Sequence, residues 1–423
     1  MAMKFRGTSL SAWMIPLAYA GGAIVFSFAA PRLGQTLWPN LTSTVSVNAA
    51  IGIYSSVASG MLALTAIVFS LTFVMVQFSA TAYSPRLVLW VARDSFIPHA
   101  MGVFTGTFLY ALASIAWVDR AGSGRVPLIG AVGVIALLIV SIIIFIGLIQ
   151  RVNRLQVTQM LMFTSEQGRG VIEKLYPPIE TPPMSPVAST ESPSIQILRH
   201  HGVPRKVQSI DISALVRVAS AAGGAIEMIS AVGDAVMEST PILRVHGCHG
   251  HVPEEILINA VQLGNERTFE QDPKYAIRLL VDIAIKALSP AVNDPTTAVQ
   301  TLDEIEDLLI RLGRRRLEIG TFRDGSGELR LSVIFPTWDD FLTLALDEIR
   351  FYGATSVQVM RRMMALVNEL LLIMPEERHP ALRYWLDRLQ TTVAGTFRDP
   401  RDVLDASLED RQGLGSSRPS ART

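Results

Sequence analysis

Residues 126–150, VPLIGAVGVIALLIVSIIIFIGLIQ, decide the fold class because they contain no Asp, Glu, Lys or Arg. The same is true of residues 7–31, 33–85 and 95–118. A helix needs about 20 apolar residues to cross the hydrocarbon core of a bilayer. We therefore predict four transmembrane helices, near Ala12–Ala30, Gly52–Ala80, Ala100–Val118 and Pro127–Ile149. The second span would be about 43 Å long at about 1.5 Å per residue, so we expect it to tilt strongly or to project beyond the lipid.

The composition agrees with a chain that lies partly outside water. Only 17% of its 423 residues are charged, against about a quarter in an ordinary soluble domain. The 37 basic and 37 acidic residues cancel, so the chain lacks the basic excess that a nucleic-acid partner requires. The single cysteine, Cys248, excludes an internal disulfide framework and a cysteine-based structural zinc site.

The orientation follows from the Lys and Arg residues in the short flanking loops, because these are retained on the cytoplasmic side. With both termini inside, the cytoplasmic flanks hold six of them and the external loops hold three. We therefore expect cytoplasmic N- and C-termini. The alternative interprets Lys4, Arg6 and the apolar run to Ala29 as a cleaved signal peptide. We disfavour it because the run exceeds the usual apolar region of about 7–15 residues.

The remainder of the chain is expected to be a cytoplasmic, mainly helical α+β domain, which makes the fold class a membrane all-α protein with such a domain attached. Apolar periodicity after Gln150 predicts that the fourth span continues as an amphipathic helix. The predicted divisions are a transmembrane domain over 1–150, a connecting helix over 151–176, a proline-rich linker over 177–194, a small α+β module over 195–251, a mainly helical domain over 252–412 and a disordered tail over 413–423.

Local patterns within these divisions predict individual elements. Lys206–Asp211 is expected as a strand and Ile212–Ala222 as a helix. The proline in Ala235–Val245 favours an edge strand or a small barrel-like fold there over a central strand. Alternating apolar residues from Leu329 to Phe335 predict a hairpin strand. Helices are expected near 253–263, 273–288, 295–312, 339–351, 355–374 and 380–397.

The second span has one face of small and polar residues. They recur at steps of three, four or seven: Ser56, Ser59, Ala63, Ala66, Ser70, Gln77 and Ala80. Such a face permits close helix packing with hydrogen bonds across the interface. Alternatively, it lines a hydrated path formed by several subunits, in which Ser70 and Gln77 offer dipoles to a solute. No predicted span holds an ionisable residue except His99 at an edge, which disfavours a proton relay.

Ser84-Pro85-Arg86 directly follows the second span. Ser84 is a good N-cap and Pro85 a good first helical residue, so these residues predict the start of a helix on the membrane surface. Arg86 would then lie near lipid phosphates, with a gating role as the alternative.

A second polar cluster spans Asp282–Thr297. Asp282 and Lys286 are four residues apart and can pair along a helix. Asp294 is expected to cap the next helix, with Pro295 at its first position. Ser289, Asn293, Thr296 and Thr297 bring further hydrogen-bonding groups to this helix N-terminus, which makes a small anionic ligand possible there.

Histidines are concentrated in the soluble part, where His246, His249 and His251 flank Cys248. These are residue types of transition-metal sites, but their spacing fits no standard zinc pattern. We expect no metal and no cofactor. Common catalytic and nucleotide-binding fingerprints are absent from the sequence, so an enzyme is not expected.

Three motifs resemble a family of bacterial predicted membrane proteins, the domain of unknown function 2254 family. They are VFSLTFVMVQFS at Val68–Ser79 with YSPRL at Tyr83–Leu87, GVFTGTFLY at Gly102–Tyr110 and DIAIKALSPAVNDP at Asp282–Pro295. The likeness extends from about Trp13 to Leu389. It implies an inner (plasma) membrane location and four spans, and it brings no activity.

Two hypotheses of different classes follow. In the first, the chain is an oligomeric channel or passive transport protein, in which the second spans of several copies meet and the cytoplasmic domain regulates them. In the second, it is a non-conducting, membrane-anchored sensor or scaffold whose soluble domain binds a small ligand or a protein. Both have the lipid bilayer as a partner, and the first requires a homo-oligomer.

Overall fold

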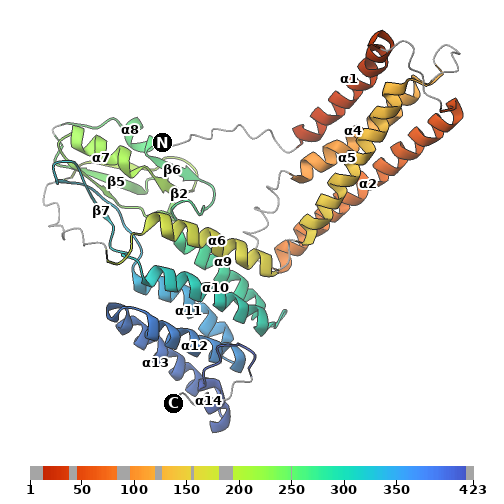
Figure 1. Cartoon of the computed structure of the whole chain (residues 1–423). Coiled ribbons are helices and arrows are strands. Elements are labelled where there is room, and N and C mark those ends of the chain that lie inside the picture. Colours follow the sequence, from red (N-terminus) through yellow and green to blue (C-terminus); the bar gives the residue numbers. More distant parts are fainter. Residues whose placement is uncertain are drawn as a thin grey trace. The chain divides into compact units, whose positions relative to one another are not determined.

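The computed structural model describes residues 13–37, 45–82, 96–119, 126–153, 157–180, 194–248 and 250–415. The chain divides into two compact units, Met1–Gln156 and Val157–Thr423. Figure 1 shows the helices and strands of both units.

The described elements of the first unit are helices, as the sequence predicts. Its described helices are α1 (Met14–Leu37), α2 (Val47–Ala82), α4 (Phe96–Ile115) and α5 (Leu128–Asn153). Each is long and apolar enough to cross a membrane. The third ends at Ile115, three residues before the expected end, and a turn follows in which Asp119 has a φ of 54°.

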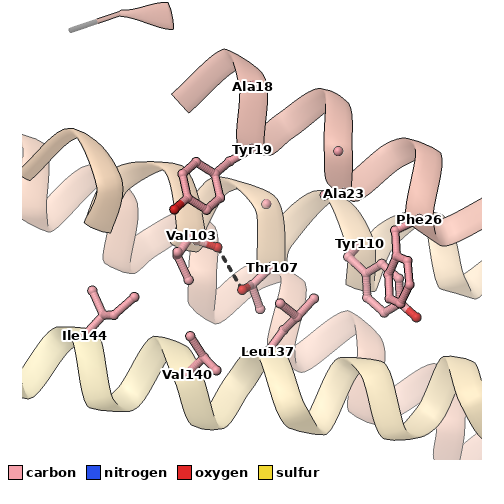
Figure 2. A pocket seen from close by; sticks show the side chains of 12 residues that line it. Ala18, Tyr19, Ala23, Phe26, Val103, Thr107, Tyr110, Leu137, Val140 and Ile144 are labelled. Carbon is pink, nitrogen blue, oxygen red and sulfur yellow. Dashed lines mark hydrogen bonds between the residues drawn. The ribbon is translucent and has the colours of Figure 1, made fainter. Parts of the chain in front are cut away.

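Two tyrosines set the spacing of three of these helices. Tyr19 of α1 lies against Gly102 of α4, where an added Cβ would stand 2.5 Å from the tyrosine ring. Tyr110 of α4 lies against Gly133 of α5, where an added Cβ would stand 2.4 Å from the hydroxyl oxygen. Figure 2 shows both tyrosines between their helices. Glycine permits these close contacts because it lacks a side chain.

The second unit begins with α6 (Val157–Leu175), and its described strands form two sheets. The larger sheet has the strand order β1-β5-β3-β8-β7, and the smaller has the order β4-β2-β6. The strands are β1 (Ser194–Arg199), β2 (Arg205–Ile210), β3 (Ala225–Met228), β4 (Ala235–Val236), β5 (Pro241–His246), β6 (Val261–Gly264), β7 (Thr321–Arg323) and β8 (Leu329–Ser332). Only the β3–β8 pairing among them is parallel.

The edge strand expected at Ala235–Val245 is confirmed for Ala235–Val236, which form β4 at the edge of the smaller sheet, and is wrong for the rest of the segment. The segment forms two strands, and the second, β5, lies inside the larger sheet between β1 and β3. Pro241 is tolerated because it is the first residue of β5, a position where proline is compatible with a strand.

The predicted modules 195–251 and 252–412 share both sheets. β6 completes the smaller sheet, and the β7–β8 hairpin extends the larger one. Leu331 accordingly packs in the same core as Leu198 and Val245. The helix expected near 253–263 is also shorter, because the chain leaves α8 (Glu254–Asn259) to pair with β2 as β6.

Six other helices agree with the sequence: α7 (Ile212–Ala221), α9 (Pro273–Ala287), α10 (Pro295–Gly313), α11 (Trp338–Gly353), α12 (Val357–Ile373) and α13 (His379–Thr396). Two further elements were not predicted, the short 3-10 helix η2 (Glu376–Arg378) and α14 (Pro400–Ser407). Within this unit α6 packs on α9 and α10, and α12 packs on α10 and α13.

The expectation of a disordered tail from Gly413 is wrong for residues 413–415. The backbone amides of Gly413 and Gly415 donate hydrogen bonds to the buried carboxylate of Asp410. Residues 413–415 are therefore ordered, whereas residues 416–423 lie outside the described part.

Candidate functional site

The described residues of the small and polar face of α2 point away from the other described helices of the first unit. Ser56, Ser59, Ser70 and Gln77 are all exposed in the first unit. Tyr54, Met61 and Val68 are instead buried on the face that packs against α4 and its neighbours. Ser59 and Val68 are nine residues apart, which is 2.5 turns at 3.6 residues per turn, so the two faces are opposite.

The exposed stripe on α2, which holds Ser56, Ser59, Ser70 and Gln77, is bordered by large apolar side chains. Leu62 and Phe69 lie on one border and Ile67 on the other, and all three are more than half exposed. The Ser56 hydroxyl donates a 2.8 Å hydrogen bond to the Gly52 carbonyl one turn earlier, which satisfies that donor within the helix. The structure thus places small residues on an outward face that approaches no described helix of the same chain.

Ser84, Pro85 and Arg86 fall within residues 83–95, outside the described residues. Their predicted role at the membrane surface therefore remains a prediction.

The loop between α9 and α10 brings five of the predicted residues together. Asp294 caps α10, accepting hydrogen bonds from the Thr297 amide at 3.1 Å and hydroxyl at 2.6 Å. The Ser289 hydroxyl donates to the Lys286 carbonyl at 2.7 Å, Asn293 has a φ of 48° and Thr296 is exposed. The helix N-terminus that could hold an anion is occupied by the Asp294 carboxylate, so this geometry adds no support for an anion there.

Asp282 lies outside this loop cluster. Its ion pair among the described residues is with Arg278, one turn before it, rather than with Lys286. The Arg278 guanidinium also donates two hydrogen bonds, at 2.8 and 2.7 Å, to the Glu348 carboxylate on α11. This bidentate contact is the strong form of an arginine–carboxylate pair and joins α9 to α11.

The histidine-rich segment has a structural explanation at His246. Its Nε2 lies 3.2 Å from a carboxylate oxygen of Glu227 on the neighbouring strand β3. His251 is exposed, and His249 is not described. Within the described ranges no three metal-binding side chains gather.

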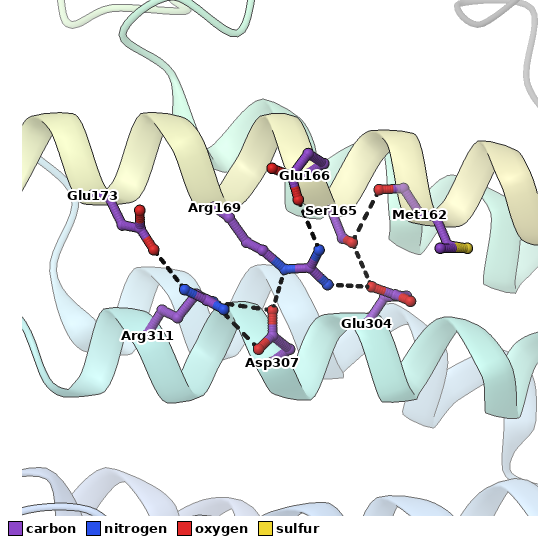
Figure 3. Close-up of polar contacts among 8 residues, drawn as sticks. All are labelled: Met162, Ser165, Glu166, Arg169, Glu173, Glu304, Asp307 and Arg311. Atoms are coloured by element: carbon purple, nitrogen blue, oxygen red, sulfur yellow. Dashed lines mark hydrogen bonds and ion pairs between the residues drawn. The ribbon is translucent and has the colours of Figure 1, made fainter.

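A charged cluster that sequence reasoning missed joins α6 to α10 (Figure 3). Arg169 of α6 donates from Nε to Asp307 at 2.7 Å and from a terminal nitrogen to Glu304 at 3.1 Å. The Ser165 hydroxyl also donates to Glu304. The pKa of Arg169 is raised, chiefly by its hydrogen bond to Asp307, so this side chain remains cationic.

Two further contacts extend the cluster and bring the helix backbones close. Arg311 of α10 pairs with Glu173 of α6. A Cβ added at Gly168 of α6 would stand 2.9 Å from Leu308 and 3.0 Å from Ala276. Charges at steps of three and four on both segments were visible in the sequence, but nothing indicated that helices about 135 residues apart would pair.

Four apolar helices followed by a mixed helical and sheet domain define a polytopic membrane protein with a large extramembrane part. The chain belongs to the family described as "Predicted membrane protein (DUF2254)", whose model matches residues 9–369. This confirms the resemblance of the three motifs.

Relatives of the chain occur in mycobacteria. It is similar to an uncharacterised protein of Mycobacterium tuberculosis strain H37Rv and to one of Mycobacterium bovis, each 26% identical over 377 residues. The matches cover 84% of this chain and 71% of each relative. No solved structure matches the chain.

Proposed function

We propose that this protein is an oligomeric channel or passive transport protein of the bacterial inner membrane, regulated by a cytoplasmic domain. The observation that carries the proposal is the outward position of Ser59 and Ser70 on α2, opposite the face that packs on α4. Small hydroxyl-bearing residues have little to gain from contact with lipid, whereas they allow helices to approach closely or face water.

In this mechanism, α2 helices from several copies meet along the stripe and enclose a path. The stripe holds neutral dipoles and no charged side chain, so it would favour small solutes without a fixed charge preference. Four spans per chain give a thin bundle, and symmetric association of copies would supply the remaining walls.

Regulation would pass through α6, the first helix after the fourth apolar helix. Its attachment to α10 by the Arg169 cluster means that a rearrangement among α9, α10 and α11 must move α6 or break charged hydrogen bonds. Coupling between the cytoplasmic domain and the path along α2 requires an element that responds to both. We expect α6 to have that role.

Cysteine cross-linking tests the association. In a Cys248→Ser background, Ser59→Cys should give covalent oligomers in native membranes with a short bismaleimide. The matched control is Ile143→Cys on α5, which is 62% exposed but lies outside the stripe. Equal cross-linking of the two variants would count against an α2 interface.

Flux measurements in liposomes test conduction. We expect the parent protein to pass a small neutral osmolyte or a monovalent salt, and Ser70→Leu and Gln77→Leu to reduce that flux several-fold. Phe69→Leu, beside the stripe, should leave it unchanged. Absence of flux in the parent would remove the channel and leave the anchored sensor or scaffold.

A further inference from the structure

A cavity of about 660 Å³ lies among α1, α4 and α5 (Figure 2). Each helix contributes about two turns to its wall: residues 18–26 of α1, 103–110 of α4 and 137–144 of α5. Two turns correspond to about 11 Å along a helix. The volume falls in the range of about 300–1,000 Å³ that is typical of small-molecule sites.

The helix packing explains why this space stays open. Tyr19 against Gly102 and Tyr110 against Gly133 fix the distances of α1 and α5 from α4. Four of the twelve lining residues are small and leave space between the helices: Ala18, Gly22, Ala23 and Gly106. The Phe26 ring stacks on Tyr110 with centroids 5.5 Å apart, and Tyr19 contacts His99 through its hydroxyl at 3.2 Å.

The walls are suited to hydrocarbon. The Thr107 hydroxyl donates to the Val103 carbonyl at 2.8 Å and lies 3.0 Å from the Ser141 hydroxyl. The Tyr19 hydroxyl is engaged by His99. Apart from these groups and the Tyr110 hydroxyl, the named lining side chains are apolar. An ion or a sugar entering here would lose its hydration with little compensation.

The cavity also reaches the outer surface of the helices. Three of its lining residues are also partly exposed: Tyr19 to 38%, Phe26 to 49% and Val140 to 42%. In a bilayer, this surface of apolar helices meets lipid chains. Filling the space restores the dispersion contacts that an empty void forfeits. We propose that the cavity is a binding site for an acyl chain of a bilayer phospholipid, a role independent of whether the protein conducts.

Two neighbouring glycines provide a matched pair of variants. A Cβ at Gly21 or at Gly22 meets nothing within 4 Å, but only Gly22 of the two lines the cavity. Gly22→Leu should therefore project into the cavity and obstruct it, whereas Gly21→Leu should leave it open. Both substitutions replace a helix glycine by a good helix former.

The test uses the full chain in phosphatidylcholine vesicles whose lipid carries a photoreactive diazirine in the middle of one acyl chain. Val103 is 8% exposed and lines the cavity, so its labelling reports a chain inside. Labelling of the Val103 peptide, normalised to that of outward Ile143, should be equal in the parent and Gly21→Leu and at least fivefold lower in Gly22→Leu. An unlabelled Val103 in the parent, or equal labelling in all three proteins, would overturn the proposal.

A second measurement excludes misfolding as the cause. In detergent, added phosphatidylcholine should raise the Tm of the parent and Gly21→Leu more than that of Gly22→Leu, whose cavity is obstructed. An equal rise in all three proteins would overturn the proposal, as would loss of labelling in Gly21→Leu as well.

Discussion

Arg169 Nε donates a 2.7 Å hydrogen bond to the Asp307 carboxylate, and through this contact α6 is joined to α10. The same guanidinium reaches Glu304 and Glu166. The two α10 carboxylates are three residues apart on one helix face and would repel each other without the arginine. The packing of α6 on α10 therefore depends on the positive charge of the Arg169 guanidinium.

Replacing this arginine should loosen α6. We expect Arg169→Ala to destabilise the second unit by about 1–2 kcal/mol, because charged hydrogen bonds are lost but the partners stay partly solvated. Lys174→Ala is the control, since Lys174 is exposed on the same helix. Denaturant unfolding of the full chain in detergent measures both. If Arg169→Ala lowers the free energy of unfolding no more than Lys174→Ala does, apolar packing alone holds α6 on α10.

The close approach of α6 can be tested with two glycines one half-turn apart. Gly168→Val should cost about 1–3 kcal/mol, because its side chain would overlap Leu308 and Ala276 and overpacking strains the core. A Cβ at Gly170 meets nothing within 4 Å, so Gly170→Val should be nearly neutral or slightly stabilising. Hydrogen exchange of the α6 backbone amides measures the stability of this helix in each variant. Similar protection in Gly168→Val and Gly170→Val would contradict the predicted close approach.

The Asp294 cap should stabilise the fold because its side-chain oxygen accepts a hydrogen bond from the Thr297 amide. Asp294→Ala removes the acceptor for the Thr297 amide and should cost about 0.5–2 kcal/mol, whereas Asp294→Ser should retain most of the cap. Thermal unfolding compares the two. An anion site at this N-terminus would instead make added phosphate stabilise Asp294→Ser more than the parent protein.

The membrane unit was largely predictable, whereas the sheets were not. Uncharged runs identify apolar helices directly because a bilayer requires about 20 such residues. Val261–Gly264 looked like the end of a helix, and only its pairing with β2, more than 50 residues earlier in the chain, makes it a strand. Local propensity cannot reveal pairings that distant.

The candidate sites were predictable to different degrees. The cap at Asp294 follows from adjacent residues and is confirmed. The stripe on α2 was visible as a periodicity, but the sequence could not show that its own chain leaves it exposed. The acyl-chain cavity was not predicted, because it depends on the spacing that Tyr19 and Tyr110 impose on three helices.

The Arg278–Glu348 pair predicts a defined acid sensitivity of the second unit. The hydrogen bonds from Arg278 lower the pKa of Glu348, whose ordinary value is about 4.3. The pair therefore stabilises the fold fully above that pH, and the contribution is lost as the pH falls through the lowered folded-state pKa. Because Glu348 is 46% exposed, we expect no more than about 1 kcal/mol.

The measurement is the Tm of the full chain in detergent between pH 7 and pH 3. Glu348→Gln should lower the Tm at pH 7 and flatten its decline below about pH 4, because the charged contact is already gone. Glu377→Gln, at an exposed position in η2, should follow the parent curve. Parallel curves for the parent and Glu348→Gln would mean that the contact between α9 and α11 contributes nothing to the acid response.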